Sequence, residues 1–452
     1  MILVNNKIIR GHTIMNPIFC QSFLSEHHSS TGQCSQNSNK TPPLSQPTPT
    51  QATTWKSGFS EDNVSDATKR RSAAYIEVRE HSSTGQRSQD SNKTRFPLGI
   101  YIHWPYCLSK CPYCDFYSSA KKCKNEDELI ESYCKDLEYY NSLNNNYNLQ
   151  SIFFGGGTPS LIKAKNIEKL INKITSLWHF NSELEISLEA NPNSNHSNMF
   201  KDLKSAGINR LSLGVQALNE KDLRFLGRTH QLDDALHAID EIVNTFDNHS
   251  IDLIYARPQQ KLTDWQQELN MATKFGLKHI SLYQLTIEDK TIFAKKGIQA
   301  LEENLASEMY TFTQEFLNSH NYPQYEVSNF GLPSIHNCGY WQGYDYIGIG
   351  NGAHGRIHID NKLYATTHHR QQELISDEER AEELIIMGLR ILEGIDKQRF
   401  QQQSHIKFED FINQKNLQKL LSQNLLINSP NHLRPTSQGL LVLNKIIYDL
   451  CI

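Results

Sequence analysis

From residue 97 onward, the sequence alternates short apolar runs with longer segments in which apolar residues recur every three or four positions. The short runs are rich in β-branched residues and predict strands at 98–104, 151–155, 184–190, 210–216, 250–256 and 279–287. The longer segments, such as 164–178, are typical of amphipathic helices. Strand, helix and strand repeated in this way predict parallel pairing with right-handed crossovers. We therefore expect an α/β fold with an open sheet or a partial (β/α)6 barrel, short of the eight units of a closed barrel.

Several polar or glycine positions lie at or near the carboxyl ends of these predicted strands. They are Cys107, Gly155, Glu189, Gln216 and Asp252. In either architecture, reactive groups lie at this end of the strands. We therefore expect these residues to face one cavity.

Three cysteines stand close together in the run Y-I-H-W-P-Y-C-L-S-K-C-P-Y-C-D-F, at Cys107, Cys111 and Cys114. Thiolates are soft ligands that suit zinc or iron–sulfur clusters. A structural zinc site closes with four protein ligands, and the nearest spare ligand, His103, lies on an apolar strand. A [4Fe–4S] cluster held by three cysteines would leave one iron open to a small molecule. Zinc or ordinary buried cysteines remain the alternatives at this point.

Glycines dominate the second motif, F-F-G-G-G-T-P-S at 153–160. Successive glycines after a strand let the backbone approach a ligand closely, and the Thr158 hydroxyl can donate or accept a hydrogen bond. If a cluster binds next to it, this turn would line the pocket that holds the charged amino-acid part of a ligand. Glu189 ends an apolar strand, where it would accept hydrogen bonds from an ammonium group or a ribose, or would simply be an exposed carboxylate.

Several motifs taken together resemble the radical S-adenosylmethionine (SAM) superfamily, and more narrowly its HemN/HemW family. They run from about residue 97 to the C-terminus and comprise C-x3-C-x2-C, G-G-G-T-P-S-L, E-A-N-P, N-R-L-S-L-G-V-Q, L-G-R-T-H, S-L-Y-Q-L-T-I-E, Y-E-V-S-N-F and Y-I-G-I-G-N-G-A-H-G. The resemblance implies that Cys107, Cys111 and Cys114 ligate a [4Fe–4S] cluster whose open iron binds SAM. It further implies SAM contacts from Tyr101, Tyr113, Gly156, Gly157, Thr158, Glu189, Gln216, Arg228 and Asp252. In such proteins the reduced cluster cleaves SAM to a radical, while the protein orients the reactants and excludes water.

Two different functions occur in this family, and Phe116 bears on the choice between them. The oxygen-independent coproporphyrinogen III oxidases carry a fourth cysteine two residues after the third, where this chain has Phe116. The sequence here resembles instead the haem chaperones of the family, which bind haem and pass it to haemoproteins. The element H-N-C-G-Y-W resembles a haem-binding element of those chaperones and makes His336 the candidate axial ligand, with Cys338 a further candidate. The alternatives are the oxidase, which converts two propionates to vinyls, and a radical enzyme acting on another substrate.

One turn departs from the family pattern. After the strand I-D-L-I-Y the family usually has Gly-Leu-Pro-Gly, whereas this chain has Ala256-Arg257-Pro258-Gln259. Glycines at such turns often adopt positive φ. Their replacement is therefore expected to shift Asp252 and to loosen the SAM pocket.

The sequence divides into three regions. Within residues 1–96, Ser, Thr, Asn, Gln and Pro dominate from about residue 27 to residue 66, and the segment 28–41 is repeated at 81–94, which predicts a disordered extension. Residues 97–330 are the expected radical SAM core, and 331–452 a C-terminal region with a smaller, mostly helical domain that includes a predicted helix at 380–392. The four histidines His354, His358, His368 and His369 match no zinc spacing.

Composition restricts the partners and the compartment. The net charge of −4 gives no basic surface for nucleic acid. No apolar run is long enough to predict a membrane span, although transient contact with membrane haemoproteins is compatible with the expected function. Nine cysteines in 452 residues do not form a disulfide framework and indicate a reducing cytoplasm.

Overall fold

The computed structural model describes residues 2–4, 7–9, 95–192, 198–367 and 370–451. Most of the predicted extension lies outside these ranges, including both copies of its repeat. Only its last two residues and two short strands are described. His368 and His369 also lie outside the described ranges. The two short strands are β1 (Ile2–Val4) and β2 (Lys7–Ile9), which pair with each other in antiparallel orientation.

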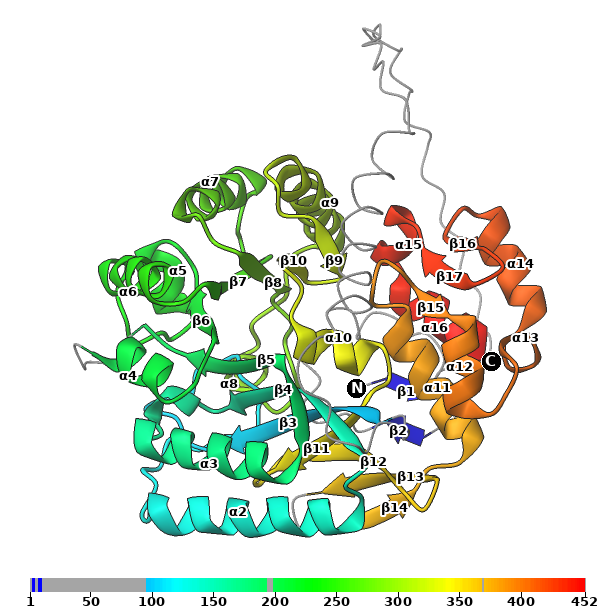
Figure 1. Cartoon of the computed structure of the whole chain (residues 1–452). Coiled ribbons are helices and arrows are strands. Elements are labelled where there is room, and N and C mark those ends of the chain that lie inside the picture. The colour runs from blue at the N-terminus through cyan, green and yellow to red at the C-terminus, as the bar shows by residue number, and fades with distance from the viewer. Residues whose placement is uncertain (1, 5–6, 10–94, 193–197, 368–369, 452) are drawn as a thin grey trace, which may run out of the picture. The chain divides into compact units, whose positions relative to one another are not determined.

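Six consecutive parallel strands form the centre of the fold, as the sequence predicted (Figure 1). They pair in chain order and are β3 (Phe96–Trp104), β4 (Tyr147–Gly156), β5 (His179–Ala190), β6 (Arg210–Gln216), β7 (Asn248–Tyr255) and β8 (His279–Gln284). The last strand ends at Gln284, three residues before the predicted end. This arrangement confirms the partial barrel and brings the carboxyl ends of all six strands to one end of the sheet.

Helices follow the strands as the apolar spacing requires. In α3 (Ala164–Leu177) the buried positions Ile167, Leu170, Ile171 and Ile174 recur at three and four residues, so one face packs on the strands. The other helices of this part are α2 (Glu126–Leu143), α4 (Met199–Ser205), α5 (Glu220–Phe225), α6 (Leu232–Thr245), α7 (Leu262–Ala272), α8 (Ile292–Lys295) and α9 (Glu303–Ser319), with short 3-10 turns η2 (Pro159–Leu161) and η3 (Thr273–Phe275).

The sequence did not predict how far the sheet extends. A further strand, β11 (Asp345–Ile349), pairs in parallel with β3, although it comes from the chain after residue 331. Antiparallel strands continue both edges and are β12 (His354–Ile359), β13 (Lys362–Thr367) and β14 (Gln372–Leu374) beyond β11, and β10 (Asn329–Gly331) and β9 (Gln324–Glu326) beyond β8. The sheet therefore continues past the expected boundary at residue 330, and that boundary stays a prediction.

Mostly helical structure follows the sheet, as expected. Its helices are α11 (Asp377–Gly388), α12 (Lys397–Ser404), α13 (Phe408–Phe411), α14 (Gln414–Ser422), α15 (Ser437–Leu441) and α16 (Leu443–Cys451), and a small sheet joins β15 (Ile395–Asp396), β17 (His432–Pro435) and β16 (Leu426–Asn428). The helix α10 (Ile335–Trp341) comes earlier, between β10 and β11. The helix predicted at 380–392 begins earlier because Ser376 and Glu379 form a capping box. In the described ranges, no helix has the length and apolar character needed to cross a bilayer.

Candidate functional site

A cavity of about 170 Å³ opens at the carboxyl ends of the parallel strands. It gathers most of the residues predicted from sequence, which are Cys107, Cys111, Cys114, Tyr113, Gly156, Gly157, Thr158, Glu189, Gln216, Arg228 and Asp252. Phe116, which stands where the oxidases have a cysteine, lines the same cavity. The convergence expected from strand order is therefore present for four of the five strand-end residues, all except Gly155, because parallel strands deliver their last residues to one place.

The cysteine loop leaves β3 after Trp104 and is held by its own backbone. The Cys107 amide donates to the Ser119 carbonyl at 3.0 Å, and the Ser119 amide donates to the Pro105 carbonyl at 2.8 Å. Between these ends, the Cys114 amide donates to the Cys111 carbonyl at 3.1 Å. Burial raises the pKa of Cys114 to about 11, so a metal bound there would have to displace the thiol proton.

Glycine is required where β4 meets this loop. A Cβ on Gly157 would lie 2.5 Å from the Tyr106 carbonyl oxygen, and one on Gly156 would lie 2.6 Å from the His103 ring. Gly156 also has a φ of +107°. The Thr158 amide then donates to the Tyr106 carbonyl at 2.9 Å. The glycines thus join the strand end to the cysteine loop by close backbone packing.

Arg228 connects the cysteine loop to the opposite wall of the cavity. Its Nη1 lies 3.5 Å from both Cys111 Sγ and the Tyr113 hydroxyl, and its Nη2 donates to the Gly214 carbonyl at 2.8 Å. Nη2 also donates to Asn191 Oδ1, whose amide nitrogen donates to Thr158 Oγ1 at 3.1 Å. Arg228 Nε is buried without a hydrogen-bond partner. Sequence reasoning did not assign Asn191, although it belongs to the E-A-N-P motif that marked the family.

Two carboxylates, Glu189 and Asp252, form the floor of the cavity. Burial raises the pKa of Glu189 to about 8, with the nearby Asp252 charge as the second cause, although the Gly156 amide donates to Glu189 at 3.3 Å. Burial also raises the pKa of Asp252, whereas hydrogen bonds from Ser281 and Ser212 lower it, the latter at 3.0 Å. Glu189 is therefore no freely solvated end-of-strand carboxylate. Both groups become better acceptors when a cation enters the cavity.

Gln216 adopts a strained backbone at the end of β6. Its φ is +73°, a region that costs a residue with a Cβ roughly 1–2 kcal/mol. The pairing of β6 with β7 shifts register between Gly214 and Gln216, which turns the Gln216 side chain to the cavity. Such strain is concentrated at functional sites, where the surrounding structure stabilises it.

Several predicted residues do not line the cavity, among them Gly155, Tyr101 and His103. Tyr101 is buried behind its wall, where its hydroxyl lies 3.0 Å from His103 Nδ1. Since His103 Nε2 must donate to the Tyr117 carbonyl at 2.8 Å, Nδ1 accepts from Tyr101. His103, considered as a spare metal ligand from sequence, therefore has both ring nitrogens occupied and supports the end of the cysteine loop.

His336 lies on α10 and is 3% exposed. Its Nδ1 lies 2.8 Å from Ser151 Oγ and its Nε2 lies 2.9 Å from the Tyr340 hydroxyl. The ring stacks on Phe153 at 5.0 Å, and burial lowers its pKa to about 3. Iron could reach this imidazole only after a hydrogen bond breaks and α10 moves. The assignments of Tyr101 and His336 stay predictions, as does that of Cys338, whose thiol pKa is raised by burial.

The turn that departs from the family pattern keeps a glycine-like backbone. Ala256 has a φ of +54° and Gln259 a φ of +64°. Asp252 lines the cavity and accepts a hydrogen bond from Ser212, and the expected effect of the missing glycines on the SAM pocket stays a prediction. Arg257 is 1% exposed and forms an ion pair with Glu268, which attaches the turn to α7.

The residues of this cavity fit an iron–sulfur cluster with a bound amino-acid ligand. Among the described residues, no three His, Cys, Asp or Glu side chains converge on one metal position, which is what a single zinc ion would need. In a cubane cluster, each thiolate binds a different iron, so convergence on one point is not required. Arg228, Glu189 and Asp252 add charged groups of both signs to this lining.

Two family models match parts of this chain, and several known proteins are similar to most of it. Residues 101–272 match the radical SAM superfamily, and residues 375–442 match the HemN C-terminal domain. The haem chaperone HemW of Buchnera aphidicola is 36% identical over 368 residues, which is 78% of this chain and 97% of the relative. HemW of Haemophilus influenzae is 32% identical over 78% and 97% of the two chains. The mitochondrial radical S-adenosyl methionine domain-containing protein 1 of Danio rerio is 34% identical over 77% and 85%.

A solved structure shares the fold. The coproporphyrinogen III oxidase HemN of Escherichia coli aligns with a TM-score of 0.67 and 19% identity over 79% of this chain and 90% of its own. At this sequence identity, the match shows only that the two proteins share an architecture.

Proposed function

The chain belongs to the HemW family within the radical SAM superfamily, and from this we propose that it is a haem chaperone that delivers haem to recipient haemoproteins. Membership of the superfamily implies a [4Fe–4S] cluster and SAM as cofactors. The observation that carries the choice of function is Phe116, a ring 38% exposed at the cavity where the oxidases of the family have a cysteine.

In the proposed site, each group of residues that lines the cavity has one role. Cys107, Cys111 and Cys114 hold the cluster, which when bound would supply one electron to SAM. Gly156, Gly157 and Thr158 offer backbone and hydroxyl groups to the methionine end of SAM. Arg228 receives its carboxylate, since the guanidinium lines the cavity next to Cys111. The two carboxylates accept hydrogen bonds from its ammonium group or ribose.

The alternative function is that of an oxygen-independent coproporphyrinogen III oxidase. This alternative is tested because the chain shares its architecture with HemN. The deciding experiment incubates the anaerobically reconstituted protein with SAM, a reductant and coproporphyrinogen III. It follows 5′-deoxyadenosine and protoporphyrinogen by chromatography. Accumulation of protoporphyrinogen with matching deoxyadenosine would make the chain an oxidase. If the cluster is intact and none forms, the chaperone remains.

Haem binding is tested directly by titrating the protein with haemin and recording the Soret band. Binding, followed by transfer to an apo-haemoprotein, is the expected result. The cysteines of the described ranges are all free thiols, which supports a reducing compartment such as the cytoplasm. Recipients there include membrane haemoproteins, contacted transiently from the aqueous side.

A further inference from the structure

The proposed function needs a histidine or similar side chain that haem iron can reach. His336 is buried, and both of its ring nitrogens have hydrogen-bond partners within the protein. We propose that His358, on β12, is the axial ligand that holds the iron porphyrin. This inference rests on the proposed haem-chaperone function and assigns its haem site to the opposite end of the sheet from the cysteine loop.

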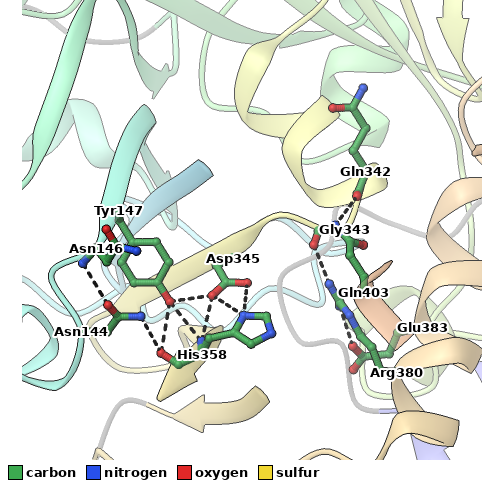
Figure 2. Close-up of polar contacts among 10 residues, drawn as sticks. All are labelled: Asn144, Asn146, Tyr147, Gln342, Gly343, Asp345, His358, Arg380, Glu383 and Gln403. Atoms are coloured by element: carbon green, nitrogen blue, oxygen red, sulfur yellow. Dashed lines mark hydrogen bonds and ion pairs between the residues drawn. The ribbon is translucent and has the colours of Figure 1, made fainter. Parts of the chain in front are cut away.

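A buried carboxylate orients the His358 ring (Figure 2). The Nδ1 of His358 lies 2.9 Å from both Asp345 oxygens, so Nδ1 carries the proton and donates it to the carboxylate. The lone pair of the neutral ring is then on Nε2. Metal-binding histidines usually donate their second nitrogen to a carboxylate in this way, which sets the tautomer and increases the basicity of the ligating nitrogen.

The carboxylate itself is held by further donors. The Tyr147 hydroxyl donates to Asp345 at 2.6 Å, and the His358 backbone amide donates to the same oxygen at 2.8 Å. Tyr147 is buried, and its pKa is raised by burial and by the Asp345 charge, so the hydroxyl keeps its proton. Asn144 also donates from its side chain to the His358 carbonyl at 2.9 Å. The ring is therefore anchored from the β4 side of the sheet.

His358 differs from the other histidines paired with carboxylates in the described ranges. The Asp345 side chain is 6% exposed, whereas the partners of His405 and His432 are 56% and 52% exposed. The His358 side chain is itself 24% exposed, so part of it is open to solvent. A ring held in one orientation by a buried carboxylate loses less conformational entropy on binding than a mobile surface histidine.

An apolar surface adjoins the ring. Phe96 stacks on His358 with centroids 5.8 Å apart and planes 15° apart, yet remains 47% exposed. A porphyrin ligated through Nε2 would lie across the imidazole plane and cover the exposed edge of Phe96. Arg95, exposed beside Phe96, supplies a cation for a haem propionate. Both residues lie at the amino end of β3, away from the cavity that follows Trp104.

The test titrates the full-length protein with haemin and compares wild type with His358→Ala. We expect the variant to bind at least about tenfold more weakly and to lose the spectrum of histidine ligation, which added imidazole should restore. His358→Met is a second variant of similar volume. Its thioether can ligate iron, so the spectrum should change to that of methionine ligation, a change that a purely structural role for His358 would not produce. His405→Ala is the matched control, because its carboxylate partner is exposed.

Each outcome decides between the two proposals. If wild type binds haemin and the His358 variants bind with unchanged affinity and spectrum, His358 is not the ligand, while the chaperone function stands. If wild type itself binds no haemin, the chaperone function and this site both fall. An equal loss in His405→Ala would also overturn the assignment, because it would mean that exposed histidines bind haemin without selectivity.

Discussion

Replacing Arg257 by Leu, the residue usual in the family, should destabilise the protein strongly. The Arg257 guanidinium is 1% exposed and contacts Glu268 through both terminal nitrogens. It also lies 3.0 Å from Asp222 and donates to the Ile254 carbonyl at 2.7 Å. The substitution would leave the Glu268 carboxylate, 4% exposed, without its cation.

The size of the expected loss in unfolding free energy depends on the hydrogen bonds that Glu268 retains. Removing one partner of a buried ion pair costs about 3–5 kcal/mol of unfolding free energy. Glu268 still accepts from the Leu218 amide at 3.0 Å and from Gln260 Nε2 at 3.3 Å, so its charge stays partly compensated. We therefore expect a loss near the lower end, about 3 kcal/mol. The double variant Arg257→Leu with Glu268→Gln keeps a carbonyl acceptor for Leu218 and should recover about 2 kcal/mol of that loss.

Urea unfolding followed by circular dichroism and by fluorescence measures these differences, since the buried Trp265 lies on the same helix as Glu268. Wild type, the two single variants and the double variant form a double-mutant cycle. A loss below about 1 kcal/mol in Arg257→Leu would refute the reasoning. So would a double variant no more stable than Arg257→Leu alone, because then the unpaired charge would not be the cause.

Three further predictions concern the cavity. Cys111→Ser should abolish the brown iron–sulfur absorbance of the reconstituted protein, whereas an unchanged spectrum with zinc found by metal analysis would contradict the cluster. Gly157→Ala, whose Cβ would lie 2.5 Å from the Tyr106 carbonyl, should cost about 1–3 kcal/mol and reduce iron loading. Gly339→Ala is its control, since that Cβ meets nothing nearer than 3.4 Å, and equal melting temperatures of the two variants would disprove the steric argument. Glu189 has a pKa of about 8 in the folded, cluster-free protein against an ordinary 4.5, so the folded state holds its proton to higher pH than the unfolded state. Stability should therefore fall as pH rises from 4.5 to 8, and Glu189→Gln should flatten this slope, which denaturant titrations at several pH values would measure.

The sequence was sufficient to predict the parallel strands and the groups at their ends. Alternating apolar periods identify β3 to β8, and parallel pairing then brings Cys107, Glu189 and Asp252 to one edge whatever the loops do. The cysteine spacing and the Phe116 position are likewise local features. These predictions depended on short-range pattern and on a general rule of strand order, so no knowledge of tertiary contacts was needed.

The sequence carries no indication of the environment of a residue where a distant segment decides it. Nothing in the five residues of β11 shows that they pair with β3, which lies more than two hundred positions earlier. The motif around His336 does not show that α10 buries the ring between Ser151 and Tyr340. Likewise, Ala256 and Gln259 appeared unsuited to a glycine turn, but both adopt positive φ while Arg257 attaches the turn to α7.

The sequence alone therefore determined the fold class, the cluster ligands expected of the family and the end of the sheet at which they gather. Only the tertiary structure decided which histidines solvent can reach and which carboxylates lie beside one another. His358 had matched no motif until β11 brought Asp345 beside it and β4 brought Tyr147. Burial and hydrogen bonding are properties of the whole neighbourhood of a side chain, and that neighbourhood is assembled from segments that are far apart in the sequence.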